Sequence, residues 1–323
     1  TEDQDYVLDP LADIDFSNLG HILENPEVEK VFHASEYDLI LLNRDYGWDV
    51  HNLFDTMWAA RILGYTHMGL ANFLQDRFDF KPSKKYQKAN WMLRPLPREQ
   101  LEYAQADTHF LLELRDQLAA ELELNGLLTE AHEIFSHEAQ VRVPPREFDP
   151  DKFWGLRGAR KLKPQALAIL KILYAKRDEL ACERNWPLFK VIGNNAMLDI
   201  ASKMPKTRKE LLLIHGVSPR IADRFGSTLL KCVKEGKNAS PPQPPQRGPR
   251  KEPEVVDRYE RLTQWRKETA QERGVESDVI LSRDAMWAIA NQNPATLADF
   301  SDITTLGPHR IEKYGARILA EIQ

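Results

Sequence analysis

An internal repeat with a period of 89 residues most constrains how this chain of 323 residues can fold. The two copies align without a gap, and apolar residues recur in both at helical spacing. Proline and glycine recur between these segments, where they mark turns between short helices. The aligned pairs include Arg177 with Arg266, Ile200 with Ile289, Ala201 with Ala290, Pro205 with Pro294, Phe225 with Tyr314 and Gly226 with Gly315. The repeat therefore predicts two copies of one small all-α domain.

A proline-rich segment separates the two copies. Residues 237–249 hold few apolar side chains, so they cannot form a core and are stiffened by proline. We therefore divide the chain into a first domain at 1–143, a first helical domain at 144–236, a linker at 237–255 and a second helical domain at 256–323. The linker leads us to expect that the second helical domain takes more than one position relative to the rest.

In the first domain, Tyr103 and Asp107 lie four residues apart in a strongly helical sequence. The run from Arg98 to Leu124 contains no glycine or proline, so one helix is expected to place both side chains on one face. The same helix is expected to bury Leu101, Leu111, Leu112, Leu118 and Leu122. A carboxylate held this way can bind a divalent cation, and the tyrosine can align a water bound to it. The alternative is a chance pair on an amphipathic helix.

A second acidic segment lies upstream, where residues 31–39 predict a buried strand that runs into a helix. Asp38 then lies on the first turn of that helix. Ligands collect where strands of open α/β sheets end, so Asp38 can converge with a carboxylate on a packed helix. Asp55 precedes Thr56 at the next expected junction of strand and helix, and we interpret it as a structural helix cap.

The motifs in the first domain resemble those of the ribonuclease D family, which belongs to the tyrosine branch of the DEDD superfamily of 3′→5′ exonucleases. Five ordered blocks carry the resemblance: residues 7–11, 32–39, 54–56, 87–96, and Tyr103 with Asp107. The resemblance implies an α/β ribonuclease-H-like exonuclease domain in which Asp38 and Asp107 bind metal and Tyr103 completes the catalytic set. It also makes His33 a packing or hydrogen-bonding residue, since Tyr103 takes the position of a base. The two repeats resemble HRDC domains, which follow the nuclease in that family.

One departure from the family pattern concerns its first motif, an Asp-x-Glu on the opening strand of the sheet. No such segment precedes Tyr6, so we expect the α/β domain of this chain to lack its first strands. The family uses four carboxylates to hold two Mg²⁺ or Mn²⁺ ions, roughly 3.5–4 Å apart, around the scissile phosphate. With Asp38 and Asp107 alone, the chain as printed is expected to be a poor nuclease.

The net charge of −5 is unevenly distributed along the chain. Residues 1–150 hold 13 basic and 28 acidic side chains (net −15), and residues 151–237 hold 19 and 8 (net +11). The remaining residues, 238–323, hold 12 and 13 (net −1). An acidic metal site attached to a phosphate-binding module produces such a pattern. The alternative is a basic surface that merely faces an acidic neighbour.

Several side chains are candidates for contact with nucleic acid. In the first domain they are Lys84, Lys85, Gln87, Lys88 and Trp91; in the first helical domain they are Lys161, Lys163 and Arg220. The lysines form a basic loop between the two acidic motifs, although such a run is also typical of a solvated face. Trp91 can stack on a base or anchor the turn at 94–96. Arg220 follows the turn at 216–219, whose backbone amides can approach a phosphodiester or simply connect two helices.

The remaining composition is that of a globular protein in a reducing compartment. Cys182 and Cys232 lie 50 positions apart and match no zinc or disulfide pattern, which favours a cytoplasmic location. No apolar run approaches the roughly 20 residues of a membrane span. We expect a monomer that does not contact a membrane.

The sequence thus favours an exoribonuclease that removes nucleotides from the 3′ end of RNA and releases 5′-monophosphates. As the resemblance implies, its substrates would include structured RNA such as tRNA precursors. DNA is an alternative substrate, because no reader of the 2′-hydroxyl is evident. An alternative of another class is a noncatalytic subunit that binds nucleic acid without cutting it.

Overall fold

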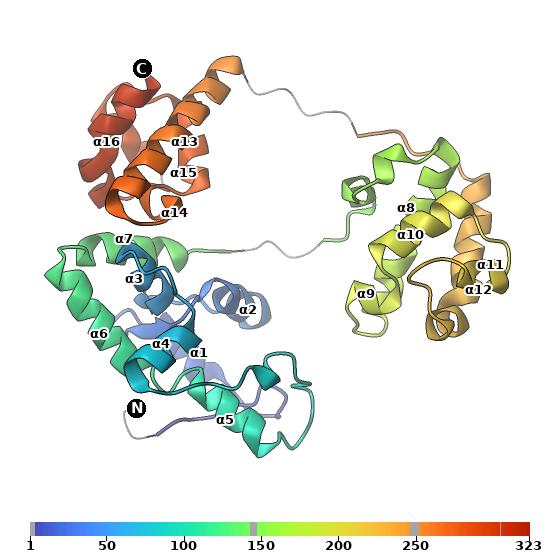
Figure 1. The fold of residues 1–323 in the computed structure, drawn as a ribbon, viewed down its shortest axis with the longest axis horizontal. Coiled ribbons are helices and arrows are strands. Elements are labelled where there is room, and N and C mark those ends of the chain that lie inside the picture. The colour runs from blue at the N-terminus through green and yellow to red at the C-terminus, as the bar shows by residue number, and fades with distance from the viewer. Residues whose placement is uncertain (1–3, 143–146, 246–251, 304) are drawn as a thin grey trace. The chain divides into compact units, whose positions relative to one another are not determined.

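Helices dominate the computed structural model, which describes residues 4–142, 147–245, 252–303 and 305–323. The chain divides into two compact units (Figure 1). One unit combines Thr1–Pro145 with Lys251–Gln323, and the other is Arg146–Arg250. The second helical domain therefore packs with the exonuclease domain, whereas the first helical domain forms a unit of its own.

The exonuclease domain contains two short parallel strands surrounded by helices. Strand β1 pairs with β2 so that Lys30 lies opposite Leu53 and Phe32 lies opposite Asp55. The elements are α1 (Ser17–Glu24), β1 (Lys30–Phe32), α2 (Glu36–Tyr46), β2 (Leu53–Asp55), α3 (Thr56–Ile62), α4 (Leu70–Phe78), η1 (Lys84–Tyr86), α5 (Arg98–Ala106), α6 (Leu111–Leu124) and α7 (Leu128–Glu138). The α/β expectation is confirmed in the form of this small sheet.

The single helix expected over 98–124 is divided into α5 and α6. Phe110 lies at the break, where its ring packs at 5.0 Å from Phe78 and 5.1 Å from Phe80, measured between ring centroids. Helix α6 then buries a regular stripe of leucines against the core: Leu111, Leu114, Leu118 and Leu122. The prediction that Leu112 is buried was wrong: Leu112 is not on the buried face of α6, and its side chain is 45% exposed. Leu101 is only partly buried.

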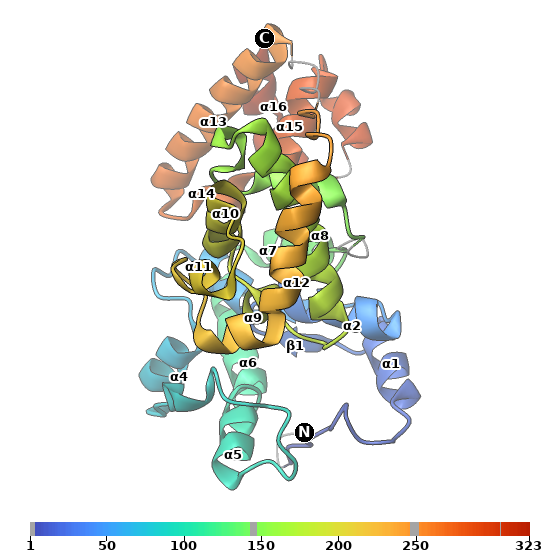
Figure 2. The ribbon, with the colours of Figure 1, turned by 90° about the vertical axis from the view of Figure 1, so that its right-hand side faces the viewer.

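The two helical domains repeat the same helices with the same offset along the chain. The first contains η2 (Pro150–Gly155), η3 (Ala159–Lys161), α8 (Pro164–Cys182), α9 (Leu188–Val191), α10 (Asn194–Lys203), α11 (Arg208–Leu212) and α12 (Pro219–Asn238). The second contains α13 (Pro253–Arg273), α14 (Ser277–Ile280), α15 (Arg283–Gln292), η4 (Leu297–Asp302) and α16 (Pro308–Ile322). Five helices of the first copy begin 89 residues before their counterparts. Within the first copy, α8 and α12 lie side by side (Figures 1 and 2).

The linker is shorter than the sequence predicted. Helix α12 continues to Asn238, and α13 begins at Pro253, because the fixed φ of proline suits the first position of a helix. Within the first helical unit, prolines 241, 242 and 244 line a cavity of about 410 Å³ beside Trp154.

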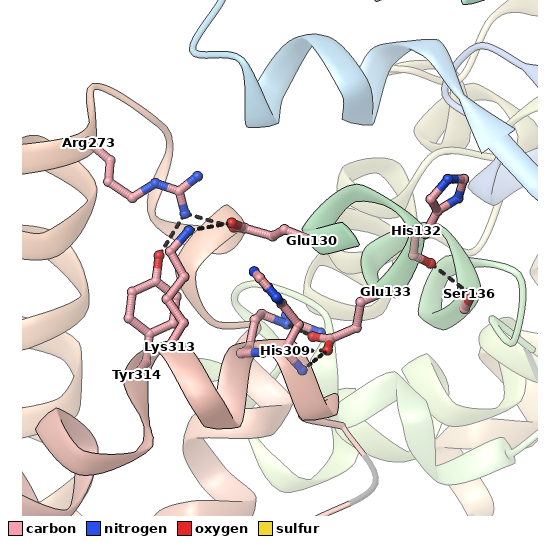
Figure 3. Close-up of polar contacts among 9 residues, drawn as sticks. Glu130, His132, Glu133, Ser136, Arg273, His309, Lys313 and Tyr314 are labelled. Atoms are coloured by element: carbon pink, nitrogen blue, oxygen red, sulfur yellow. Dashed lines mark hydrogen bonds and ion pairs between the residues drawn. The ribbon is translucent and has the colours of Figure 1, made fainter. Parts of the chain in front are cut away.

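A buried acid on α7 joins the second helical domain to the exonuclease domain (Figure 3). The side chain of Glu130 is 0% exposed and accepts hydrogen bonds from Arg273 Nη1 at 2.7 Å and Lys313 Nζ at 2.6 Å. Arg273 also donates to the Tyr314 hydroxyl at 2.7 Å. Burial alone would raise the pKa of Glu130, but the two cations outweigh it and hold that pKa below its usual range. We call Glu130, Arg273, Lys313 and Tyr314 the Glu130 cluster.

A second acid on α7, one turn further on, caps helix α16 from outside. Glu133 Oε2 accepts the backbone N–H of His309 at 2.7 Å, and Oε1 accepts Arg310 Nε at 2.5 Å (Figure 3). Because the first N–H groups of a helix have no partner within it, a carboxylate at this end is stabilising. Glu130 and Glu133 of α7 thus bind one face of the second helical domain.

Further contacts between α3 and α14 support this arrangement. Arg61 pairs with Glu276 at 2.6 Å and also with Asp278. The Val279 side chain is fully buried in the apolar core of the exonuclease domain. Charged and apolar contacts thus join the second helical domain to the exonuclease domain in this structure, and the expectation of several positions stays a prediction.

Candidate active site

Asp55 fixes the turn that presents Asp38. The carboxylate of Asp55 is fully buried and accepts four backbone N–H groups, from Ala34 (3.1 Å), Ser35 (2.7 Å), Met57 (2.9 Å) and Trp58 (3.1 Å). It therefore caps α3 and also holds the loop between β1 and α2, in which Ala34 has a left-handed backbone with φ of 59°. The structural role predicted for Asp55 is confirmed.

His33 is likewise held in a structural hydrogen bond. Its Nδ1 lies 2.9 Å from the Thr56 hydroxyl, which donates to the Phe32 carbonyl at 3.0 Å. The hydroxyl has one proton to donate, so His33 Nδ1 donates to it. Burial lowers the pKa of His33. The packing and hydrogen-bonding role predicted for His33 is confirmed.

Asp38 lies on the first turn of α2, as the sequence predicted. The residue is exposed, yet the surrounding protein desolvates its carboxylate and raises its pKa, and the charge of nearby Asp55 raises it further. Among the described residues, no hydrogen-bond donor compensates this carboxylate. A cation would compensate it, because an opposite charge favours the ionised form.

Tyr103 and Asp107 form the second part of the candidate site. Tyr103 lies on α5, and Asp107 caps the carboxyl end of that helix. Gln87 forms a hydrogen bond with the phenol, and the ring lies 6.4 Å from that of Tyr86 and 6.1 Å from that of Trp91, measured between centroids. Burial and the charge of Asp107 raise the pKa of Tyr103, so the phenol is protonated at neutral pH. Tyr103 is therefore a hydrogen-bond donor rather than a base.

The Asp107 carboxylate resembles that of Asp38 in its surroundings. It is exposed, and partial desolvation by the protein raises its pKa. The charge and openness of these two carboxylates fit a divalent cation. Two carboxylates are, however, too few ligands for a complete metal site. Within the described ranges, no group of three or more His, Cys, Asp or Glu side chains is placed to hold a metal.

The predicted nucleic-acid residues near Tyr103 differ in their surroundings. Lys85 and Lys88 are exposed, whereas the side chain of Lys84 lies outside the described residues. Gln87 is exposed but engages Tyr103. Trp91 is partly buried, and its backbone carbonyl accepts Arg94 Nη1 at 2.9 Å, so it contributes to the predicted turn as well as to the surroundings of Tyr103.

The predicted residues in the first helical domain are all exposed. Lys161 ends η3, Lys163 precedes α8, and Arg220 lies on the first turn of α12. The turn before α12 contains Gly216, whose φ of 86° favours glycine. These side chains are therefore free to meet a phosphate.

The sequence did not indicate the contacts of Asp5. This carboxylate accepts Gln105 Nε2 at 2.6 Å and lies 2.8 Å from His109 Nδ1, so it holds the N-terminal segment against the end of α5 next to Asp107. The partners are about 100 residues away in the sequence, and no local pattern signals the contact. A cavity of about 340 Å³ beside Tyr103, lined by Lys81, Lys85, Glu99 and Glu102 among others, was also not predicted.

Glu138, at the end of α7, is a second acid that sequence patterns missed. Burial raises its pKa to about 7; a hydrogen bond from Trp58 lowers it, and the charges of Asp55 and Glu36 raise it. The folded protein therefore binds a proton on Glu138 more tightly than the unfolded chain does. The contribution of this proton to folding stability is fully present below pH 4.5 and is lost as the pH rises to about 7. We predict that Glu138→Gln, which keeps an acceptor for Trp58, is more stable than the parent by about 1–2 kcal/mol at pH 8 and equal to it at pH 4.

Urea denaturation at the two pH values measures this difference, with exposed Glu123→Gln as the control. An equal effect of Glu138→Gln at pH 4 and pH 8 would contradict the prediction.

Comparisons with known proteins agree with this arrangement. A family model described as 3′-5′ exonuclease matches residues 1–123, and one described as HRDC domain matches 166–233 and 256–322. Ribonuclease D of Nitrobacter hamburgensis is 30% identical over 98% of this chain and 82% of its own length. This chain belongs to the ribonuclease D family. Its activity class is that of a hydrolytic 3′→5′ exoribonuclease.

More distant relatives share parts of the ribonuclease D architecture. Human exosome complex component 10 is 32% identical over 64% of this chain, which spans 24% of that protein's length. The crystal structure of Escherichia coli RNase D, described as an exoribonuclease involved in structured RNA processing, matches 98% of this chain and 84% of its own. Its TM-score of 0.62 at 23% identity shows the same fold. Exonucleases of this family generally depend on divalent metals.

No helix within the described ranges combines the length and the apolarity needed to cross a membrane.

Proposed function

We propose that this ribonuclease D family member shortens structured RNA, such as tRNA precursors, from the 3′ end and releases 5′-monophosphates. The observation that carries the proposal is the position of the Tyr103 phenol, which Gln87 holds one helical turn from the uncompensated carboxylate of Asp107. A donor beside a metal-binding carboxylate can orient the attacking water.

Asp38 and Asp107 are the residues that would hold Mg²⁺ or Mn²⁺, together with the carboxylates of the family's first motif. Bound cations would supply an activated water and stabilise the charge on the phosphate in a two-metal reaction. Tyr103 would donate a hydrogen bond that fixes the direction of attack. Asp55 and Asp5 would position the two loops, since both already hold backbone or side-chain donors near the candidate ligands.

Exposed basic side chains would hold the RNA backbone. Lys85 and Lys88 lie near Tyr103 in the exonuclease domain, and Lys161, Lys163 and Arg220 belong to the segment with a net charge of +11. Contacts with phosphates dominate affinity for nucleic acids and weaken with salt. This supports a first helical domain that grips RNA while the exonuclease domain acts on its end.

The test uses a protein that carries the complete acidic set and digests a 5′-labelled RNA hairpin with a single-stranded 3′ tail, alongside a DNA strand of the same sequence. Stepwise shortening from the 3′ end, release of 5′-monophosphates and arrest by EDTA are expected. Cleavage of DNA at an equal rate would overturn the preference for RNA. Tight binding without cleavage by the full gene product would favour the noncatalytic alternative.

A charge substitution tests the role of the first helical domain. We predict that Lys161→Ala with Lys163→Ala weakens RNA binding about tenfold at 0.15 M salt and lowers the salt slope of log affinity by about 2. Fluorescence anisotropy with labelled RNA over a range of salt concentrations measures both quantities. Exposed Lys267 of the second helical domain, changed to Ala, is the control. A slope equal to that of the parent would show that the two lysines do not meet phosphates.

A further inference from the structure

The second helical domain shows what one face of this repeated fold can bind. That face receives α7, a helix with two carboxylates one turn apart. Glu130 binds Arg273, which ends α13, and Lys313 on α16. Glu133 binds Arg310 and the start of α16 (Figure 3). The occupant is therefore an acidic helix, and the receiving groups are basic side chains at the junction of two helices.

The 89-residue offset locates the equivalent face on the first helical domain. Arg273 corresponds to Arg184 and Lys313 to Arg224, so two basic side chains recur. Further correspondences are Tyr314 with Phe225, His309 with Arg220, Val275 with Trp186 and Asp278 with Phe189. Asp278, one of the two acids that bind Arg61 in the second copy, is thus replaced by an aromatic residue, and a further arginine is added. We call Arg184, Trp186, Phe189, Arg220 and Arg224 the Arg184 face.

The arginines of the Arg184 face contact aromatic rings. The Arg184 guanidinium lies 5.3 Å from the centre of the Phe225 ring, whereas Arg273 in the second copy donates a hydrogen bond to the hydroxyl of Tyr314, the counterpart of Phe225. The Arg224 guanidinium lies 4.9 Å from the centre of the Trp186 indole. The turn that follows α8 therefore carries Arg184, and the first turns of α12 carry Arg220 and Arg224.

The Arg184 face has no occupant among the described residues of its own unit. Arg184, Arg220 and Arg224 are exposed, Phe189 is 70% exposed, and Leu213 in the turn before α12 is 82% exposed. Two acids lie beside the face in the sequence: Glu183 pairs with Arg184 itself at 2.9 Å, and Asp223 pairs with Arg208. Three arginines together with exposed apolar side chains are typical of a protein interface.

We propose that the Arg184 face binds an amphipathic acidic helix of a partner protein that carries two carboxylates one turn apart. The first carboxylate meets both Arg184 and Arg224, as Glu130 meets Arg273 and Lys313, and the second meets the start of α12 at Arg220. The equivalent face of the second copy binds an acidic helix, α7, which supports this occupant. The positive charge of the Arg184 face is complementary to the negative charge of such a helix. Single-stranded RNA fits less well. Arg224 covers the Trp186 ring and Phe225 is buried, so Phe189 alone is open for stacking on a base, and Leu213 cannot stack.

The test uses the full chain and a helix-stabilised, fluorescein-labelled peptide with the sequence of residues 126–140, because an isolated helix of this length is marginal in water. Anisotropy measures its binding to the parent, to Arg184→Glu with Arg224→Glu, and to the control Lys231→Glu with Lys234→Glu. The control reverses the same number of charges on exposed residues of α12. We expect saturable binding that weakens at least tenfold in the arginine variant and stays within twofold in the control.

Two further measurements separate the face from a general charge effect or a folding defect. A peptide with Gln at positions 130 and 133 is expected to bind at least tenfold more weakly. Phe189→Ser, at a side chain too exposed to support the core, is expected to weaken binding at least threefold. Equal binding by the parent and the arginine variant would overturn the proposal.

Two other occupants are distinguished in the same experiment. If a 12-nucleotide polyuridine binds the parent, loses affinity in the arginine variant and displaces the peptide, the face takes RNA and the proposal is wrong. If sedimentation shows dimers of the parent that the arginine variant lacks, a second copy of this chain is the occupant, which also overturns it.

Discussion

Replacing Glu130 with Ala is expected to release the second helical domain from the exonuclease domain. The substitution leaves Arg273, 18% exposed, and Lys313, 33% exposed, without their acid. Removing one partner of a buried ion pair costs about 3–5 kcal/mol of folding free energy. Because the two cations are partly exposed, we expect a loss of about 3 kcal/mol. Urea denaturation should then show an early transition of the second helical domain, and limited proteolysis should cut the linker region first.

The same cluster predicts how acid affects the interface. The two cations hold the pKa of Glu130 below its ordinary value of 4.5 in the folded protein. The stability that Glu130 contributes is therefore present above about pH 4.5 and lost as the pH falls through its folded pKa. Glu130→Ala should remove this acid dependence, whereas exposed Glu123→Ala should leave it and the urea midpoint unchanged. A single transition at the parent's midpoint in Glu130→Ala would show that the apolar contacts of Val279 suffice.

The repeat was predictable because its signals are local. Proline at the first position of α8 and of α13, 89 residues apart, begins a helix in both copies, and apolar residues at helical spacing continue it. Asp38 and Asp55 were placed correctly for a similar reason. An acid at the junction of a strand and a helix either caps the helix or faces outward from its first turn, and both choices follow from short-range geometry.

The position of the second helical domain was not predictable from such signals. Glu130 and Arg273 are separated by 143 residues, and on sequence alone Glu130 is one of 28 acids in residues 1–150. The proline-rich linker suggested independent motion, yet linker composition determines only reach and stiffness. The break between α5 and α6 was missed because it depends on the packing of Phe110 against Phe78 and Phe80, which lie 30 or more positions upstream.

Asp107→Asn and Tyr103→Phe are expected to reduce RNA cleavage for different reasons. In a protein that carries the complete acidic set, Asp107→Asn should lower kcat/KM by about a thousandfold, because a metal ligand supplies several kcal/mol of transition-state stabilisation. Tyr103→Phe should lower kcat by about a hundredfold with little change in KM, because the water loses its orienting donor. Gln87→Ala, which frees the phenol without removing it, should have a smaller effect in the same direction.

The dependence on metal concentration separates the two roles. Asp107→Asn should raise the Mn²⁺ concentration needed for half-maximal activity and weaken Mn²⁺ binding measured by electron paramagnetic resonance. Tyr103→Phe should change neither quantity, because a protonated phenol that donates a hydrogen bond adds no negative charge to the site. If Tyr103→Phe weakened Mn²⁺ binding as much as Asp107→Asn, the phenol would be acting as a ligand. The assignment of Asp107 as the metal-binding carboxylate would then no longer follow from the comparison.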